Sequence, residues 1–131
     1  STGKERFNLD YIERHLEDLS EIEPRDVQAT LCEFTAVTVA DAIQRWGPES
    51  AQVIVCGGGR LNSDLMQRLD AHLTRRSVIR SEELDIDGDS LEAAAFAWLA
   101  RCFIDRVASS VPAVTGARGE RILGCLYPSG V

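Results

Sequence analysis

The sequence has little positive charge and no long apolar run, and each absence excludes a class of protein. Its 14 Lys and Arg residues are outnumbered by 21 Asp and Glu residues, so the formal net charge is −7. A chain of this charge is poorly suited to non-specific binding of nucleic acid or of an anionic membrane. No run of apolar residues is long enough to cross a bilayer. We therefore expect a cytoplasmic protein with neither a nucleic-acid nor a membrane partner.

The chain also lacks the cysteine and histidine spacing of a metal site. No C-x-x-C pair occurs, and both histidines have charged neighbours on predicted helices. Reduced thiols are expected in a cytoplasmic protein, in preference to disulfides or metal ligation. The sequence therefore predicts two surface histidines, no metal centre and four reduced, buried thiols, which are Cys32, Cys56, Cys102 and Cys125.

Helices and strands are predicted to alternate along most of the 131 residues, of which 44% are hydrophobic. This order predicts an α/β fold: a single domain over residues 1–131, with helices on both faces of a small parallel or mixed sheet. Because few strands are predicted, we expect the rest of the sheet to lie outside this chain. Helices are predicted to begin at Asn8, Pro24, Asn62 and Ser90, and strands are predicted at Val53–Cys56 and Ser77–Arg80. We expect Pro112–Gly119 to form a loop and Ile122–Tyr127 to form either a strand or an extended docking segment.

Two of these elements are apolar on more than one face. The helix over residues 24–46 carries two apolar stripes, which predicts that it lies between two layers. The strand Val53–Cys56 shows no polar alternation, as is typical of a central strand covered on both faces. Gly47 and Pro48 follow the helix, and we expect Gly47 to form a left-handed cap.

The most informative motif is the run Cys56-Gly57-Gly58-Gly59, which lies directly before the predicted helix start at Asn62. Three glycines are more than a turn requires. Since each one loses much conformational entropy on folding, the extra glycines indicate a further role for the bare backbone. Bare backbone next to a helix N-terminus suits an anionic ligand such as a phosphate. The spacing fits neither a P-loop nor G-x-G-x-x-G. The residues predict a nucleotide or phosphate half-site, with a tight turn as the alternative.

Three other motifs have structural explanations that compete with functional ones. Glu92 follows Asp89 by three residues, which is the spacing of a helix capping box. The acidic run over residues 82–89 lacks the ligand spacing of an EF-hand, and we expect a solvated turn. The phrase Ser1–Glu5 combines hydroxyl groups, glycine and Lys4, and would either bind an anion or form a frayed chain end.

Five phrases together resemble the C-terminal third of the anhydro-N-acetylmuramic acid kinase family. They are STGKERFN at 1–8, DVQATL at 26–31, CGGG at 56–59, EAAAFAWLA at 92–100 and VTGA at 114–117, in the family's order. The resemblance implies the fold of the actin, hexokinase and heat-shock-chaperone ATPase superfamily, in which two RNase H-like lobes close on ATP. This chain would then be an incomplete RNase H-like (actin-like ATPase) lobe.

The family uses ATP, with Mg²⁺ expected, to open the 1,6-anhydro ring of anhydro-N-acetylmuramic acid with water and to phosphorylate O6. This recycles cell-wall amino sugar in the bacterial cytoplasm. By the resemblance, Gly57, Gly58 and Gly59 match the adenosine motif, Asn62 helps to position the nucleotide, and Glu92 faces the sugar pocket. The implied partners are ATP, the anhydrosugar, the remainder of the kinase chain and a homodimer, which family members often form.

Two phrases of the family are absent from this sequence: its phosphate-binding Gly-Thr-Ser phrase and the phrase that carries the general-base Asp. We therefore expect no catalytic residue in this chain. We also expect no turnover by the chain alone, because no base is present to take the proton from water. Two alternatives stay open. One is a levoglucosan-kinase-like anhydrosugar kinase, and the other is a non-catalytic nucleotide-binding or oligomerisation module.

Overall fold

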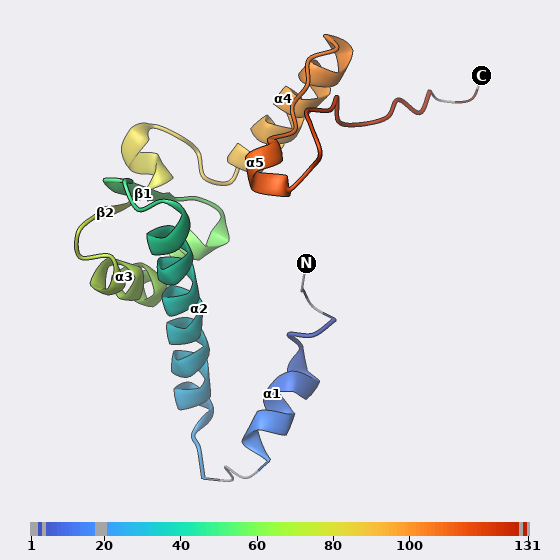
Figure 1. Ribbon diagram of the computed structural model, residues 1–131. Helices are drawn as coiled ribbons and strands as arrows, with labels where there is room; N and C mark the ends of the chain where they lie inside the picture. The colour runs from blue at the N-terminus through green and yellow to red at the C-terminus, as the bar shows by residue number, and fades with distance from the viewer. Residues whose placement is uncertain (1–2, 4, 18–20, 129, 131) are drawn as a thin grey trace.

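The computed structural model describes residues 3, 5–17, 21–128 and 130. Figure 1 shows three parts along the chain: helices α1 and α2, a small sheet with α3, and a C-terminal part with α4 and α5. The elements are α1 (Leu9–Leu16), α2 (Pro24–Trp46), β1 (Gln52–Val55), the 3₁₀ helix η1 (Gly58–Leu61), α3 (Ser63–His72), β2 (Ser77–Arg80), the 3₁₀ helix η2 (Ser81–Leu84), α4 (Leu91–Ile104) and α5 (Pro112–Thr115).

The centre of the molecule is a β1–α3–β2 unit. The two strands pair in parallel, in register from Gln52 opposite Ser77 to Val55 opposite Arg80. Helix α3 is the connection between them, because parallel strands cannot be joined by a tight turn. Helix α2 packs along α3. The predicted α/β class is confirmed, with a core that includes Ala36 and Ala40 of α2, and Leu69 and Leu73 at the end of α3.

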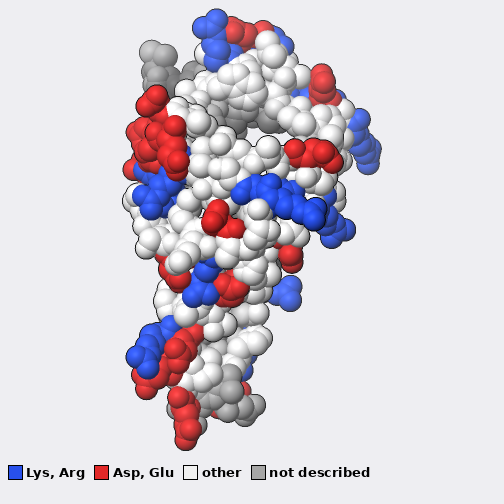
Figure 2. Space-filling model, turned by 90° about the vertical axis from the view of Figure 1, so that its left-hand side faces the viewer, with Lys and Arg blue, Asp and Glu red and all other residues white. Residues whose placement is uncertain are grey.

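Ion pairs fasten α2 to α3. Glu33 of α2 receives hydrogen bonds from Arg68 Nη1 and His72 Nε2 of α3, each at 2.6 Å. The hydrogen bond from the Arg68 guanidinium lowers the pKa of the Glu33 carboxyl most, and the bond from His72 lowers it further. In Figure 2, basic side chains on the visible face lie beside acidic ones rather than forming one continuous basic surface. Both His15 and His72 are exposed, which confirms their predicted place on the surface.

The predictions about layers are wrong for the described residues. Phe34 and Trp46 of α2 are 52% and 78% exposed, so this helix is covered on one face rather than two. Ile54 of β1 is 45% exposed, and none of the four residues of that strand is fully buried. The physical reason is the small size of the sheet, because two strands and one crossover helix do not supply layers on both faces.

Helices α1 and α2 begin as the sequence predicts. Asn8 Oδ1 accepts a hydrogen bond from Tyr11 N at 3.0 Å, and Pro24 occupies the first position of α2. The predicted left-handed cap at Gly47 is wrong, because this residue has φ −129° and its N–H donates to Ile43 O. Pro48 follows directly, and a proline disfavours helical conformations in the residue before it.

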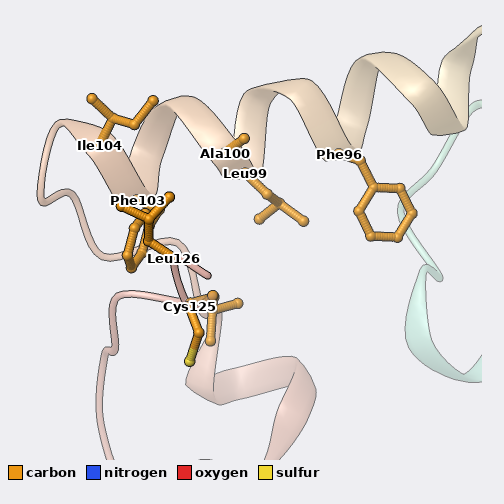
Figure 3. A pocket seen from close by; sticks show the side chains of 9 residues that line it. Phe96, Leu99, Ala100, Phe103, Ile104, Cys125 and Leu126 are labelled. Atoms are coloured by element: carbon orange, nitrogen blue, oxygen red, sulfur yellow. The ribbon is translucent and has the colours of Figure 1, made fainter. Parts of the chain in front are cut away.

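The C-terminal part differs from its predicted loop and strand. Residues 112–115 form the short helix α5, because Pro112 suits a first helical position and Gly116, at φ +69°, ends the turn. Ile122–Tyr127 forms no strand and is an irregular, exposed segment, so its role in docking stays a prediction. Figure 3 shows Cys125 and Leu126 of this segment beside Phe103. These residues line a cavity of about 480 Å³.

All four cysteines are free, as predicted, but their predicted burial is only partly correct. Cys102 is buried and Cys32 is half-buried, whereas Cys56 and Cys125 are exposed because they lie beyond β1 and in the irregular C-terminal segment. Among the described residues, no helix combines the length and the hydrophobicity that a membrane span needs. Within the same ranges, no three His, Cys, Asp or Glu side chains gather closely enough to hold a metal ion.

Candidate functional site

The glycine loop leaves the end of β1 with its backbone uncovered. Gly57 has φ +71° and ψ −179°, a region that residues with a side chain essentially never adopt. A Cβ added at Gly57 or at Gly58 would meet nothing within 4 Å, whereas one at Gly59 would touch Leu65 of α3 at 3.5 Å. Backbone geometry therefore explains the glycine at 57, but nothing within the described chain requires the one at 58.

A cavity of about 510 Å³ lies between this loop and the start of α4. Its size is within the usual range for small-molecule sites. It brings together three of the predicted site residues, Gly57, Gly58 and Glu92, while Gly59 and Asn62 are outside its lining. The lining residues are Cys56, Gly57, Gly58, Gly88, Asp89, Leu91, Glu92 and Ala95.

Asn62 is occupied as the N-cap of α3. Its Oδ1 accepts hydrogen bonds from Asp64 N at 3.1 Å and from Leu65 N at 3.2 Å. These are the backbone donors that would otherwise be available to an anion at the helix start. A phosphate at this position would have to displace the cap, so a role for Asn62 in nucleotide binding stays a prediction.

The predicted capping box between Asp89 and Glu92 is wrong. Ser90 is the N-cap residue of α4, and it makes no side-chain capping bond. The Asp89 carboxylate is instead held by Arg60 at 2.7 Å. Glu92 lies exposed in the first turn of α4, and no side-chain hydrogen bond joins it to the described residues. Its carboxylate is therefore available to a ligand in the cavity.

Arg60 is the residue that sequence reasoning missed. It is only 4% exposed, although it directly follows an open glycine loop. Its Nε donates to Glu82 Oε1 at 2.5 Å, and its Nη1 donates to Asp89 Oδ1 at 2.7 Å and to Gly57 O at 2.9 Å. The guanidinium lowers the pKa of both carboxyls. The acidic run is therefore not a wholly solvated turn, because two of its members neutralise a buried cation.

Gly88 makes room for this guanidinium. A Cβ added there would collide with Arg60 Nε and would lie 2.7 Å from both Arg60 Cδ and Ser81 Oγ. The Gly57 N–H also donates to Gly88 O at 3.1 Å, so a second bond joins the glycine loop to the acidic turn. The signal for this contact was present in the sequence as one arginine beside the glycines and a run of acids. The partners are 22 and 29 residues away, and only the parallel return of β2 beside β1 brings them together.

The lining of the cavity carries negative charge. Asp89 and Glu92 contribute carboxylates, and no cationic side chain is among the described lining residues. Carboxylates accept hydrogen bonds from hydroxyl groups and repel a bare phosphate. The cavity is therefore better suited to a sugar or ribose than to a free phosphate group. Ser1, Thr2 and Lys4 of the proposed anion phrase lie outside the described residues, and within it Gly3 N donates to Glu5 Oε1 at 2.9 Å.

The chain is similar to one family along nearly its whole length. The family model described as "Anhydro-N-acetylmuramic acid kinase" matches residues 1–129. Among curated proteins of that name, one from Albidiferax ferrireducens is 50% identical over 98% of this chain and 33% of its own length. One from Xylella fastidiosa is 47% identical over 98% of this chain and 34% of its own. One from Pseudomonas savastanoi pv. phaseolicola is 45% identical over 98% and 35%. The chain thus spans about a third of the length of these relatives.

Proposed function

The chain belongs to the anhydro-N-acetylmuramic acid kinase family, and we propose that it is the C-terminal part of an ATP-dependent kinase with that activity. The parent enzyme would open the 1,6-anhydro bond with water and phosphorylate O6, in cytoplasmic recycling of peptidoglycan sugar. The observation that carries the proposal is the cavity in which the glycine loop meets Glu92, in a chain matched to the family over residues 1–129.

The nucleotide half of the site is assigned to the glycine loop. ATP fits the residues present, because Gly57 and Gly58 have open space where a Cβ would stand. A ligand can therefore approach the main chain closely at this point. When bound, ATP supplies the phosphoryl group. The loop contributes shape and backbone contacts, and Asn62 would keep the start of α3 in place beside it.

The sugar half is assigned to the first turn of α4. Glu92 is exposed and lines the cavity, so its carboxylate can accept hydrogen bonds from sugar hydroxyls. Two such bonds would orient the anhydrosugar relative to the glycine loop. Orientation of this kind accounts for much of the rate that an enzyme gains, because it replaces a collision between two free molecules.

Mg²⁺ would come with the nucleotide rather than occupy a site built by this chain. The described residues hold no cluster of three metal-ligating side chains. Mg²⁺ commonly keeps several waters and is bound through one or two carboxylates and the substrate phosphates. Asp89 and Glu92 would then be too few to hold the ion alone, and further ligands would come from the rest of the parent protein.

We also propose that the β1–α3–β2 unit is part of an RNase H-like lobe and that the parent protein forms a homodimer. The general base belongs to the remainder of the parent chain, because the family's Asp-containing phrase does not occur in this sequence. Residues 1–131 alone would then bind ligand weakly and transfer no phosphate.

A coupled assay of ADP release tests these assignments. The full-length parent protein and the 131-residue chain are each given ATP with anhydro-N-acetylmuramic acid or with levoglucosan. We expect turnover by the full-length protein with the first sugar only, and none by the short chain. Turnover with levoglucosan alone would assign the protein to the other anhydrosugar kinase. ATP binding without turnover on either sugar would favour a non-catalytic module, and phosphorylation by the short chain would refute the placement of the base.

A further inference from the structure

We propose that Arg60 is a positioning residue that sets the separation between the nucleotide and sugar walls of the cavity. The inference rests on the proposed function for the identity of the two ligands. Arg60 itself is not among the residues that line the cavity. It acts through groups that do, namely the Gly57 carbonyl on one wall and Asp89 on the other.

The geometry of these contacts leaves Arg60 little freedom. Its side chain is 5% exposed, and Nη1 is shared between Gly57 O at 2.9 Å and Asp89 Oδ1 at 2.7 Å. Nε is held by Glu82 from η2. The planar guanidinium fixes the directions of its N–H groups, so one side chain determines where three segments lie relative to one another.

Each of the three segments carries part of the site or supports it. Gly57 begins the glycine loop, Asp89 lies three residues before Glu92, and Glu82 supports the guanidinium from outside the cavity. The hydrogen bond from Gly57 N to Gly88 O is a second link between the glycine loop and the acidic turn. Within the described residues, loss of the guanidinium would leave this single backbone bond to join the glycine loop to the acidic turn, so the loop and the start of α4 would be free to shift relative to each other.

The chain contains a matched control for a purely structural effect. Arg68 also pairs with two carboxylates, Glu33 at 2.6 Å and Asp64 at 3.0 Å, but it fastens α3 to α2 and does not line the cavity. Replacement of either arginine by glutamine removes one cation and two ion pairs. Only the replacement of Arg60 releases groups that belong to the cavity.

The test measures ATP affinity by titration calorimetry, together with KM and kcat for both substrates, in the full-length protein. We expect Arg60→Gln to raise the Kd and KM for ATP between about tenfold and a hundredfold, as small misplacements of binding groups do. Arg60→Lys keeps the charge but not the fork, so its values should be intermediate. Arg68→Gln should lower the melting temperature and leave the Kd and both KM values within about twofold, because neither Arg68 nor its two partners line the cavity.

Two results would overturn the inference: an unchanged ATP affinity in Arg60→Gln, or an equal loss in Arg68→Gln. If Arg60→Gln does not fold, Glu82→Gln is the second variant, because it removes the ion pair that holds Arg60 from outside the cavity. It should raise the Kd for ATP, and an unchanged Kd would overturn the inference. ATP binding by a wild-type protein that phosphorylates neither sugar would refute the proposed function and leave the Arg60 comparison valid. A wild-type protein that does not bind ATP would refute both.

Discussion

The two glycines at the cavity wall should respond to alanine in opposite ways. Gly57 has φ +71° and ψ −179°, and an added Cβ meets no atom within 4 Å, so its cost is backbone strain alone. Strain in this region amounts to about 1–3 kcal/mol. Gly58 lies in η1 with no positive φ and equally open space. Alanine there reduces the entropy of the unfolded chain, which stabilises the protein by about 0.4–1 kcal/mol.

Urea unfolding of the full-length parent protein measures both effects. Gly57→Ala should lower the free energy of unfolding by about 1–3 kcal/mol. Gly58→Ala should raise it by about 0.4–1 kcal/mol, yet should weaken ATP binding because Gly58 lines the cavity and a methyl group there removes open space beside the main chain. Gly58→Ala is therefore the informative variant, since it separates binding from stability.

Two results would refute this reasoning. Equal destabilisation by the two alanines would show that the backbone conformation at Gly57 does not distinguish it from Gly58. Unchanged ATP affinity in Gly58→Ala, and likewise in Gly58→Arg, would show that no ligand approaches the chain at this point.

Three further predictions follow from burial, capping and charge. Leu73→Ala should lower the unfolding free energy by about 2–5 kcal/mol, measured by urea unfolding, because Leu73 is 1% exposed; a loss below that range would contradict its place in the core. Asn62→Ala should lower the free energy of unfolding by about 0.5–2 kcal/mol, and Asn62→Asp should lower it much less. A large change in ATP affinity in Asn62→Asp would show that Asn62 also contacts the nucleotide directly. The lowered pKa values of Glu82 and Asp89 stabilise the folded state above about pH 4.5, and this stability is lost as the pH falls through the lowered values. Acid unfolding should therefore be less steep in Arg60→Gln, and identical profiles would contradict the ion pairs.

The sequence was a good guide where the controlling interactions are local. Asn8 and Asn62 cap helices with side chains that reach only two or three residues along the chain. The apolar strands and the helix between them also follow from short-range periodicity, and so the βαβ unit could be predicted. Gly47 is an exception, because it ends α2 without the left-handed conformation that a C-terminal glycine usually adopts.

The sequence was a poor guide where burial depends on distant segments. Phe34 and Ile54 belong to apolar patterns that predict covered faces, yet both are exposed among the described residues. The pairing of Arg60 with Glu82 and Asp89 depends on how β2 returns beside β1. Asp89 illustrates the limit well, because its spacing from Glu92 fits a local cap while its carboxylate binds a cation 29 residues away in sequence.

The central claim is that the glycine loop and Glu92 form the nucleotide and sugar walls of one cavity. Its most direct test is the pair of KM values, for ATP and for anhydro-N-acetylmuramic acid, in full-length Gly58→Arg and Glu92→Gln. We expect Gly58→Arg mainly to raise the KM for ATP and Glu92→Gln mainly to raise the KM for the sugar. Wild-type KM values for both substrates in both variants would contradict it.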